Sequence, residues 1–151
     1  MFQKLKKLIY IICFSLSMTS LNAFVISGND SCRGSKVYGF DFDENAILPM
    51  VSIQVSENTI IPDITMKIVD NPREADLIFV DNFDDAKMKI CRVNNILSDE
   101  KIKVGRNIIL PDIKIKLSKN PIFPDYKIYI SSQIFTNSEV AAIFALLWKK
   151  K

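Results

Sequence analysis

The sequence contains no histidine, and this absence excludes more chemistry than any single motif suggests. Among its 151 residues there are no His, four Gly, three Cys and one Trp. Without His the chain carries no Ser-His-Asp triad, no Cys-His pair, no His-ligated metal and no imidazole pH switch. Four scattered glycines provide no Gly-rich loop to hold the phosphates of a nucleotide. We therefore expect no cofactor, and the sequence favours a protein that is not an enzyme.

Long apolar runs are also scarce, and the one at the N-terminus has the pattern of an export signal. Three lysines within the first seven residues precede the uncharged run Leu8–Leu21, and Ala23 follows it. A cationic start, a short apolar run and a small residue are typical of a secretory signal peptide. The run is shorter than the ~20 residues that span a bilayer. We predict a signal peptide over residues 1–23 and a periplasmic or secreted chain with no transmembrane segment after cleavage.

An excess of charge is lacking too, once that segment is removed. The chain has a formal net charge of +3, and residues 1–23 contain three Lys and no acid. The remaining residues therefore hold 17 basic and 17 acidic side chains. Overall basicity gives no reason to expect nucleic acid as a partner.

Two of the three cysteines, Cys32 and Cys91, lie outside the predicted signal peptide. In an oxidising compartment an even pair favours a disulfide. Closing a loop of about 60 residues stabilises a fold by about 4 kcal/mol in the chain-entropy model. We predict this disulfide; the alternative is two thiols, with Cys91 buried in a strand.

The clearest internal pattern is a short unit that starts with Pro or Ala, usually followed by Asp, and then alternates. The unit starts lie 13, 11, 25 and 13 residues apart. Alternation with a period of two is typical of a strand with one buried face. Pro is tolerated at the first position of a strand, where its missing N–H costs no ladder bond. The five units are Pro62–Ile68, Ala75–Val80, Ala86–Cys91, Pro111–Leu117 and Pro124–Ile130.

Two more strands are expected upstream of these units, Ser35–Phe42 as the first strand and Met50–Val55 as the second. The run Leu77–Val80 is apolar on both faces, which predicts a central strand. The sequence thus predicts a mainly β (α+β) fold of tandem short alternating strands in one compact domain over residues 24–151, with repeat units over about 62–135.

The period changes near the C-terminus. Thr136-Asn137-Ser138-Glu139 has the pattern of a capping box, and the apolar residues after it follow helical spacing. We expect a helix over about 138–149 that packs on the sheet as part of the core. A helix that binds a partner is the alternative, and nine apolar residues are too few to cross a membrane.

The repeated units resemble those of the 7(1) septoil knot domain family. The residues that carry the resemblance are the run Ala75-Asp76-Leu77-Ile78-Phe79-Val80-Asp81, the segment Ala86-Lys87-Met88-Lys89-Ile90 and the two Pro-Asp units before the helix. The resemblance covers about residues 62–135. It implies a compact β-rich domain whose strands thread into a deep torus knot, with no established activity or cofactor. The chain departs from the family pattern where Lys87 replaces Asp and where one gap reaches 25 residues.

Carboxylates gather at two places. One group is Asp41, Asp43 and Glu44, and the other is Asp81, Asp84 and Asp85. Oxygen ligands on a loop suit Ca²⁺, although the spacing matches no EF-hand. Two carboxyl groups flanking a cleft would also suit a hydrolase. Solvated turn residues are the ordinary interpretation of both groups.

Lysines recur at the fourth position of their units, at Lys89, Lys114 and Lys127. If the strands align in register, these side chains would form a basic face that could bind an acidic glycan, lipopolysaccharide or nucleic acid. Aromatic residues do not alternate with them, so nucleic acid is not expected. Lysines also keep an exposed sheet face soluble and prevent edge pairing.

The first functional hypothesis is an exported, non-catalytic binding or structural accessory domain of the periplasm or envelope. Its partner would be an envelope component that the sequence does not identify. A small carboxylate-dependent hydrolase and a calcium-stabilised extracellular module are the two alternatives.

Overall fold

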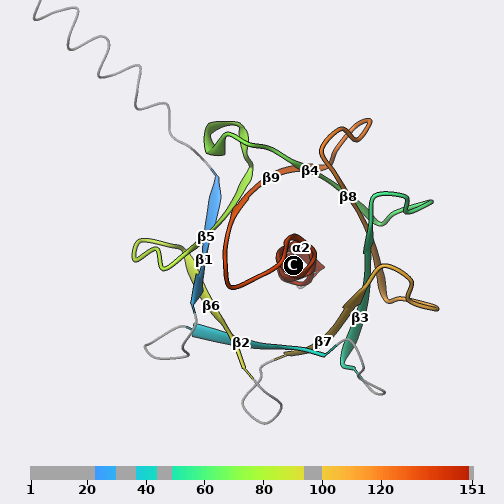
Figure 1. Cartoon of the computed structure of the whole chain (residues 1–151), viewed down its shortest axis with the longest axis horizontal. Coiled ribbons are helices and arrows are strands. Elements are labelled where there is room, and N and C mark those ends of the chain that lie inside the picture. The colour runs from blue at the N-terminus through green and yellow to red at the C-terminus, as the bar shows by residue number, and fades with distance from the viewer. Residues whose placement is uncertain (1–22, 30–36, 44–48, 94–99, 150–151) are drawn as a thin grey trace, which may run out of the picture.

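The strands close into a barrel around a central helix (Figure 1). The computed structural model describes residues 23–29, 37–43, 49–93 and 100–149. Within these ranges the strands are β1 (Phe24–Asn29), β2 (Val37–Phe42), β3 (Val51–Ser56), β4 (Ile64–Ile68), β5 (Leu77–Asp81), β6 (Met88–Arg92), β7 (Glu100–Gly105), β8 (Ile113–Ser118) and β9 (Tyr126–Ser131). A short 3-10 turn, η1 (Pro72–Glu74), precedes β5, and the helix α2 (Asn137–Lys149) follows β9. The predicted β-rich fold with one C-terminal helix is confirmed.

Consecutive strands are never neighbours in this barrel. Going round from β1, the order is β6, β2, β7, β3, β8, β4, β9 and β5, and β5 closes the ring by pairing with β1. Strands β1 to β5 therefore occupy every second position, and β6 to β9 fill the positions between them. Each of the nine pairings is parallel. In most folds sequential strands lie side by side, whereas here the contacts between strands join distant parts of the chain.

The predicted alternation sets the inner face of the barrel. Each strand contributes an apolar side chain that is at most 3% exposed, and the intervening positions face outward. Burying a side chain of this size contributes about 1.5–3 kcal/mol relative to leaving it in water. In strand order these residues are Ile26, Phe40, Ile53, Met66, Phe79, Ile90, Ile102, Ile115 and Ile128.

The C-terminal helix lies along the axis of the barrel and not on an outer face. Figure 1 shows the chain turning inward after β9 and α2 seen end-on at the centre of the ring. Seven consecutive residues, Val140–Leu146, are buried. The expectation of a helix that packs on the sheet as part of the core is confirmed, and the sheet in addition closes around α2. The sequence does carry the signal, because a helix that is apolar on all sides must be buried on all sides.

Two strands were absent from the predicted set. β1 (Phe24–Asn29) precedes the segment that was expected to hold the first strand, so that segment contributes β2 and is the second strand. β7 (Glu100–Gly105) fills the gap of 25 residues between units. It alternates through Lys101, Ile102, Lys103 and Val104, but it lacks the Pro or Ala start that marks the repeated units.

β5 is buried on both sides, as its sequence predicts. Leu77 and Phe79 belong to the core inside the barrel, whereas Ile78 packs outside it with Val69 and Ala75. The segment around η1 therefore covers the outer face of β5. The term central strand does not distinguish β5, because every strand of a closed barrel has two neighbours.

The Asp of the repeated unit joins neighbouring strands at their starts. Its backbone N–H donates to the carbonyl of a residue on the next strand, and its carboxylate accepts from the N–H of that same residue. For Asp63 and Lys114 these distances are 2.8 and 2.7 Å. The carboxylate thus serves as a backbone carbonyl would and satisfies an N–H that the ladder leaves unpaired. The same double bond joins Asp76 to Lys127, Asp112 to Ser52 and Asp125 to Thr65.

Lys87 shows what the unit retains without Asp. Its N–H donates to the carbonyl of Val25 at 3.1 Å, which is the backbone half of the same arrangement. Its ammonium lies 5.6 Å from the centre of the Phe24 ring. The departure from the unit pattern therefore removes the carboxylate bond and leaves the strand pairing in place.

Candidate functional site

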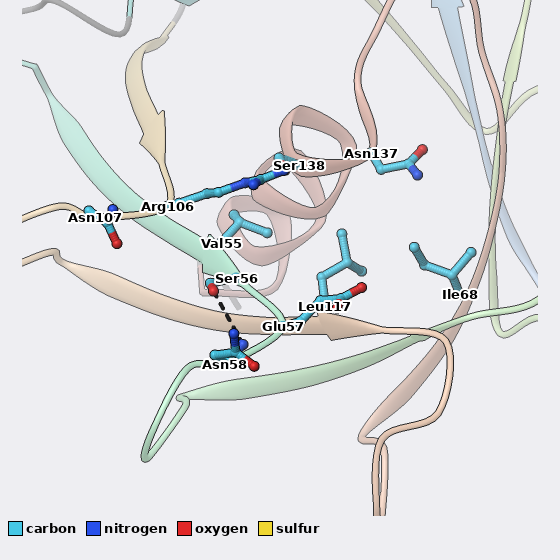
Figure 2. Close-up of a pocket in the computed structure, with 10 residues that line it drawn as sticks. All are labelled: Val55, Ser56, Glu57, Asn58, Ile68, Arg106, Asn107, Leu117, Asn137 and Ser138. Carbon is cyan, nitrogen blue, oxygen red and sulfur yellow. Dashed lines mark hydrogen bonds between the residues drawn. The ribbon is translucent and has the colours of Figure 1, made fainter.

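A polar cavity opens at the end of the barrel where the strands finish and α2 begins (Figure 2). Its volume is about 520 Å³. Val55, Leu117 and Ile68 supply the apolar part of its lining, from the ends of β3, β8 and β4. The polar part consists of Ser56, Glu57, Asn58, Arg106, Asn107, Asn137 and Ser138.

Hydrogen bonds hold the loops around this cavity in place. The N–H of Asn58 donates to the hydroxyl of Ser56 at 3.2 Å. The Thr59 hydroxyl is placed to donate to the carbonyls of Ser56 and Ile115, at 3.1 and 3.2 Å. The Gln54 side-chain amide donates to the carbonyl of Arg106 at 2.9 Å. Figure 2 shows the Arg106 side chain extending along the cavity toward Ser138 at the start of α2.

A second cavity of about 760 Å³ adjoins the first and shares Arg106, Asn107 and Ser138 with it. Its lining includes Arg92 and Glu139, whose side chains form an ion pair at 2.8 Å.

Glu139 is also the acid of the predicted capping box. Its carboxylate accepts from the N–H of Thr136 at 2.8 Å, and its own N–H donates to the Thr136 hydroxyl at 3.3 Å. The guanidinium of Arg92 lies 5.3–5.4 Å from the rings of Phe42 and Phe135. This end of the barrel therefore presents guanidinium, amide and hydroxyl groups together with the carboxylates of Glu57, Asp43 and Glu139.

The first group of predicted acids lies only partly at this site. Asp41 is buried in β2, and Asp43 lines the second cavity with its carboxylate 3.9 Å from the ammonium of Lys101. Glu44 lies outside the described residues. The structure thus brings one acid of this group, Asp43, into a cavity wall.

The second group of predicted acids follows β5 on another part of the ring. Asp81 accepts from the Ser132 hydroxyl and from the N–H of Gln133, both at 2.6 Å. Asp84 is exposed and lies 3.6 Å from the ammonium of Lys89. Asp85 is exposed as well. In the part of the chain that the structure describes, no three acids or cysteines come close enough to hold a metal ion. The calcium site stays a prediction.

The three predicted lysines do not share one face. Lys114 on β8 and Lys127 on β9 flank β4, whereas Lys89 on β6 lies between β1 and β2. Lys127 instead pairs in register with Lys67 of β4.

The structure describes only one cysteine of the predicted disulfide. Cys91 lies fully buried in β6, and Cys32 falls outside the described residues. The disulfide therefore stays a prediction. The same holds for the signal peptide, because only Ala23 of residues 1–23 is described.

Three residues at this end of the barrel carry no signal in the sequence, namely Arg92, Arg106 and Asn107. They stand at or just after the ends of β6 and β7, where alternation gives no signal. Only closure of the barrel brings them to the start of α2.

Comparisons with protein-family models, with curated protein sequences and with solved structures find no match to this chain. Among the described residues, no helix has the length and apolar character needed to cross a membrane.

Proposed function

We propose that this chain is an exported, non-catalytic domain that acts in the envelope by binding a partner or as a structural accessory. The filled barrel carries this proposal. Barrels of similar size that bind small molecules do so in their interior, and here α2 occupies that space with seven buried residues in a row. Surface contacts are then the main means by which the molecule can act.

The use of the carboxylates supports the same proposal. Four repeated aspartates accept bonds from backbone N–H groups of neighbouring strands. Asp81 is held by two donors of the segment that leads to α2. A glycosidase-type mechanism requires two carboxyl groups that face each other across a cleft. The acids of β2 and β5 are separated in the ring by β1 and β6.

One observation favours the alternative, a small carboxylate-dependent hydrolase. Asp43 lines the second cavity together with Arg92, Lys103 and Glu139. The test is an assay of the purified protein and of an Asp43→Ala variant against chromogenic glycosides, esters and phosphate esters. We expect no turnover by either protein. Hydrolysis by wild type that Asp43→Ala abolishes, with an unchanged circular dichroism spectrum, would overturn the non-catalytic proposal.

Export is tested separately in cells that produce the full chain. Cell fractionation followed by mass spectrometry is expected to find a chain that starts at Phe24 in the exported fraction. An unprocessed chain in the cytosol contradicts export.

We also propose that the backbone of this chain is knotted, as the resemblance to the septoil knot family implies. Two interleaved rounds of strands, followed by a helix that enters the ring, support this proposal. Stretching the chain from both ends in an optical trap tests it. A tightened knot shortens the fully extended chain, so an extension equal to the full contour length would contradict it.

A further inference from the structure

Three loops of the barrel have the same tip, with two large apolar residues directly before Pro-Asp. The apolar pairs precede the Pro-Asp starts of β4, β8 and β9. Each of the six side chains is 82–92% exposed. Scattered single apolar residues are normal on protein surfaces, whereas a repeated, almost fully exposed pair requires an explanation. The pairs are Ile60-Ile61, Ile109-Leu110 and Ile122-Phe123, and we refer to them as the loop tips.

The second residue of each loop tip has a positive φ angle, which apolar residues rarely adopt. Ile61, Leu110 and Phe123 have φ angles of 53°, 54° and 53°. This left-handed region disfavours bulky and β-branched residues and suits Gly or Asn. Asn82, on the loop after β5, takes the same conformation with φ 52°. A sequence selected for stability alone would place Gly or Asn at these three positions. The apolar pairs therefore serve another purpose.

The loop tips precede three neighbouring strands of the ring. β9, β4 and β8 are consecutive neighbours, and all three strands run in the same direction. Because each tip directly precedes its strand, the three tips approach the same sector of the barrel. Figure 1 shows these loops projecting outward from the right-hand side of the ring.

The sector that carries the loop tips has a small excess of positive charge although the chain outside the predicted signal peptide is neutral. The three loops and the strands that follow them, residues 57–68 and 106–131, contain six Lys or Arg and four Asp or Glu, a net charge of +2. Three of these carboxylates, those of Asp63, Asp112 and Asp125, accept bonds from backbone N–H groups. Lys119 is exposed on the loop that carries Ile122-Phe123. The apolar side chains therefore lie in a sector with a net positive charge.

We propose that the loop tips insert into the interface of a lipid bilayer that contains anionic lipids. Interfacial binding combines apolar side chains that enter the acyl boundary with Lys and Arg that meet anionic headgroups. A bilayer accepts separate apolar tips without a matching pocket for each, whereas a protein partner would have to provide three. This inference deepens the proposed envelope-binding role, on which it rests, by naming the partner.

The test is flotation of the protein with vesicles of phosphatidylglycerol and phosphatidylcholine, compared with vesicles of phosphatidylcholine alone. The central variant is the triple substitution Ile61→Asn, Leu110→Asn and Phe123→Asn, which places a tolerated residue at each positive φ and so preserves folding. Phe83→Asn is the control, because Phe83 is an exposed apolar residue in the loop between β5 and β6 and not in a loop that leads into β4, β8 or β9. All proteins are prepared with the same N-terminus, so a difference in vesicle binding does not come from the N-terminal segment.

We expect wild type and Phe83→Asn to bind the anionic vesicles at least about tenfold more tightly than the triple variant does. High salt should weaken binding, because it screens the basic sector. Equal binding by wild type and the triple variant overturns the inference, as does an exported wild type that binds no vesicles. Dimerisation in sedimentation that the triple variant abolishes would make a second copy the occupant, and it also overturns the inference. Failure of the proposed function is distinct: it would show as an unprocessed cytosolic chain or as hydrolytic activity.

Discussion

Asp63 and Lys114 exchange two hydrogen bonds although they are 51 residues apart in the chain. The N–H of Asp63 donates to the Lys114 carbonyl at 2.8 Å, and the Asp63 carboxylate accepts from the Lys114 N–H at 2.7 Å. A residue at the start of β4 thereby fixes the register of β8. The repeated Pro-Asp is thus a device for joining strands that belong to different rounds of the barrel.

Replacing Asp63 with Ala removes the carboxylate and leaves the N–H of Lys114 without its acceptor. A hydrogen bond to a charged group contributes about 1.5–3 kcal/mol, and solvent exposure places this one toward the lower value. We expect a loss of about 1–2 kcal/mol in the free energy of unfolding, measured by urea denaturation. Asp84→Ala is the control, since Asp84 is fully exposed and forms only a 3.6 Å ion pair. Equal midpoints for the two variants would contradict the role assigned to Asp63.

Gly28 in β1 allows three neighbouring side chains to approach the strand closely. A Cβ atom there would lie 2.9 Å from Asp81 Oδ1 and from Phe79 Cε1, and 3.1 Å from Phe135 Cδ2. Overpacking of this kind destabilises by about 1–3 kcal/mol, so Gly28→Ala should lower the denaturation midpoint. Gly105→Ala is the matched control, because its nearest contact is the flexible Ile108 side chain at 3.3 Å. A midpoint for Gly28→Ala as high as that of Gly105→Ala would argue against this packing.

Phe144 in α2 tests whether the helix truly fills the barrel. It is 1% exposed, and truncation of a buried Phe costs about 3–5 kcal/mol. We expect Phe144→Ala to lose stability in this range, whereas Ile60→Ala on a loop tip stays within about 0.5 kcal/mol of wild type. Thermal denaturation followed by circular dichroism measures both. A small loss for Phe144→Ala would place the helix outside the barrel.

Removal of divalent metal should leave the melting temperature unchanged. Both carboxylate oxygens of Asp81 accept bonds from protein donors, and Asp43 and Asp84 lie beside lysines. Differential scanning calorimetry with and without a chelator makes the comparison. A melting temperature that falls with chelator and recovers with added Ca²⁺ would favour the calcium-stabilised module.

The predicted bond between Cys32 and Cys91 can be read from the intact mass. Reduction in denaturant should add two hydrogen atoms to the wild-type protein and none to a Cys91→Ala variant. Denaturant is required because Cys91 is fully buried. Identical wild-type masses before and after reduction reject the bridge. The same spectrum reports whether the chain starts at Phe24.

Much of the local structure follows from alternation. The units that start at Pro62, Ala75 and Pro111 become β4, β5 and β8. The three alternate apolar residues of β8 are buried, whereas in β4 Met66 is buried and Ile64 and Ile68 are half-buried against the core. β7 was missed because Lys101–Val104 alternates without the Pro or Ala start of the repeated units. The helix was found, but its place was not, because helical period alone does not tell which surface encloses it.

The candidate site depended more strongly on tertiary structure. Arg92 and Arg106 meet the start of α2 only because β6 and β7 end at the same mouth. Three of the acids that the sequence offered as candidate site residues have other partners: Asp81 accepts bonds from Ser132 and Gln133, and Asp43 and Asp84 lie beside lysines.

Sequence alone determined the positions of seven of the nine described strands and the presence of the helix, because local period and burial are linked directly. It also determined the absence of imidazole chemistry, because no fold can supply a side chain that the chain lacks. Only tertiary structure decided the order of strands, the path of α2 through the ring and the grouping of the loop tips. The physical reason is that parallel pairing between two rounds of the chain depends on contacts between distant residues such as Asp112 and Ser52, 60 positions apart. No local pattern encodes which of several similar strands becomes the neighbour.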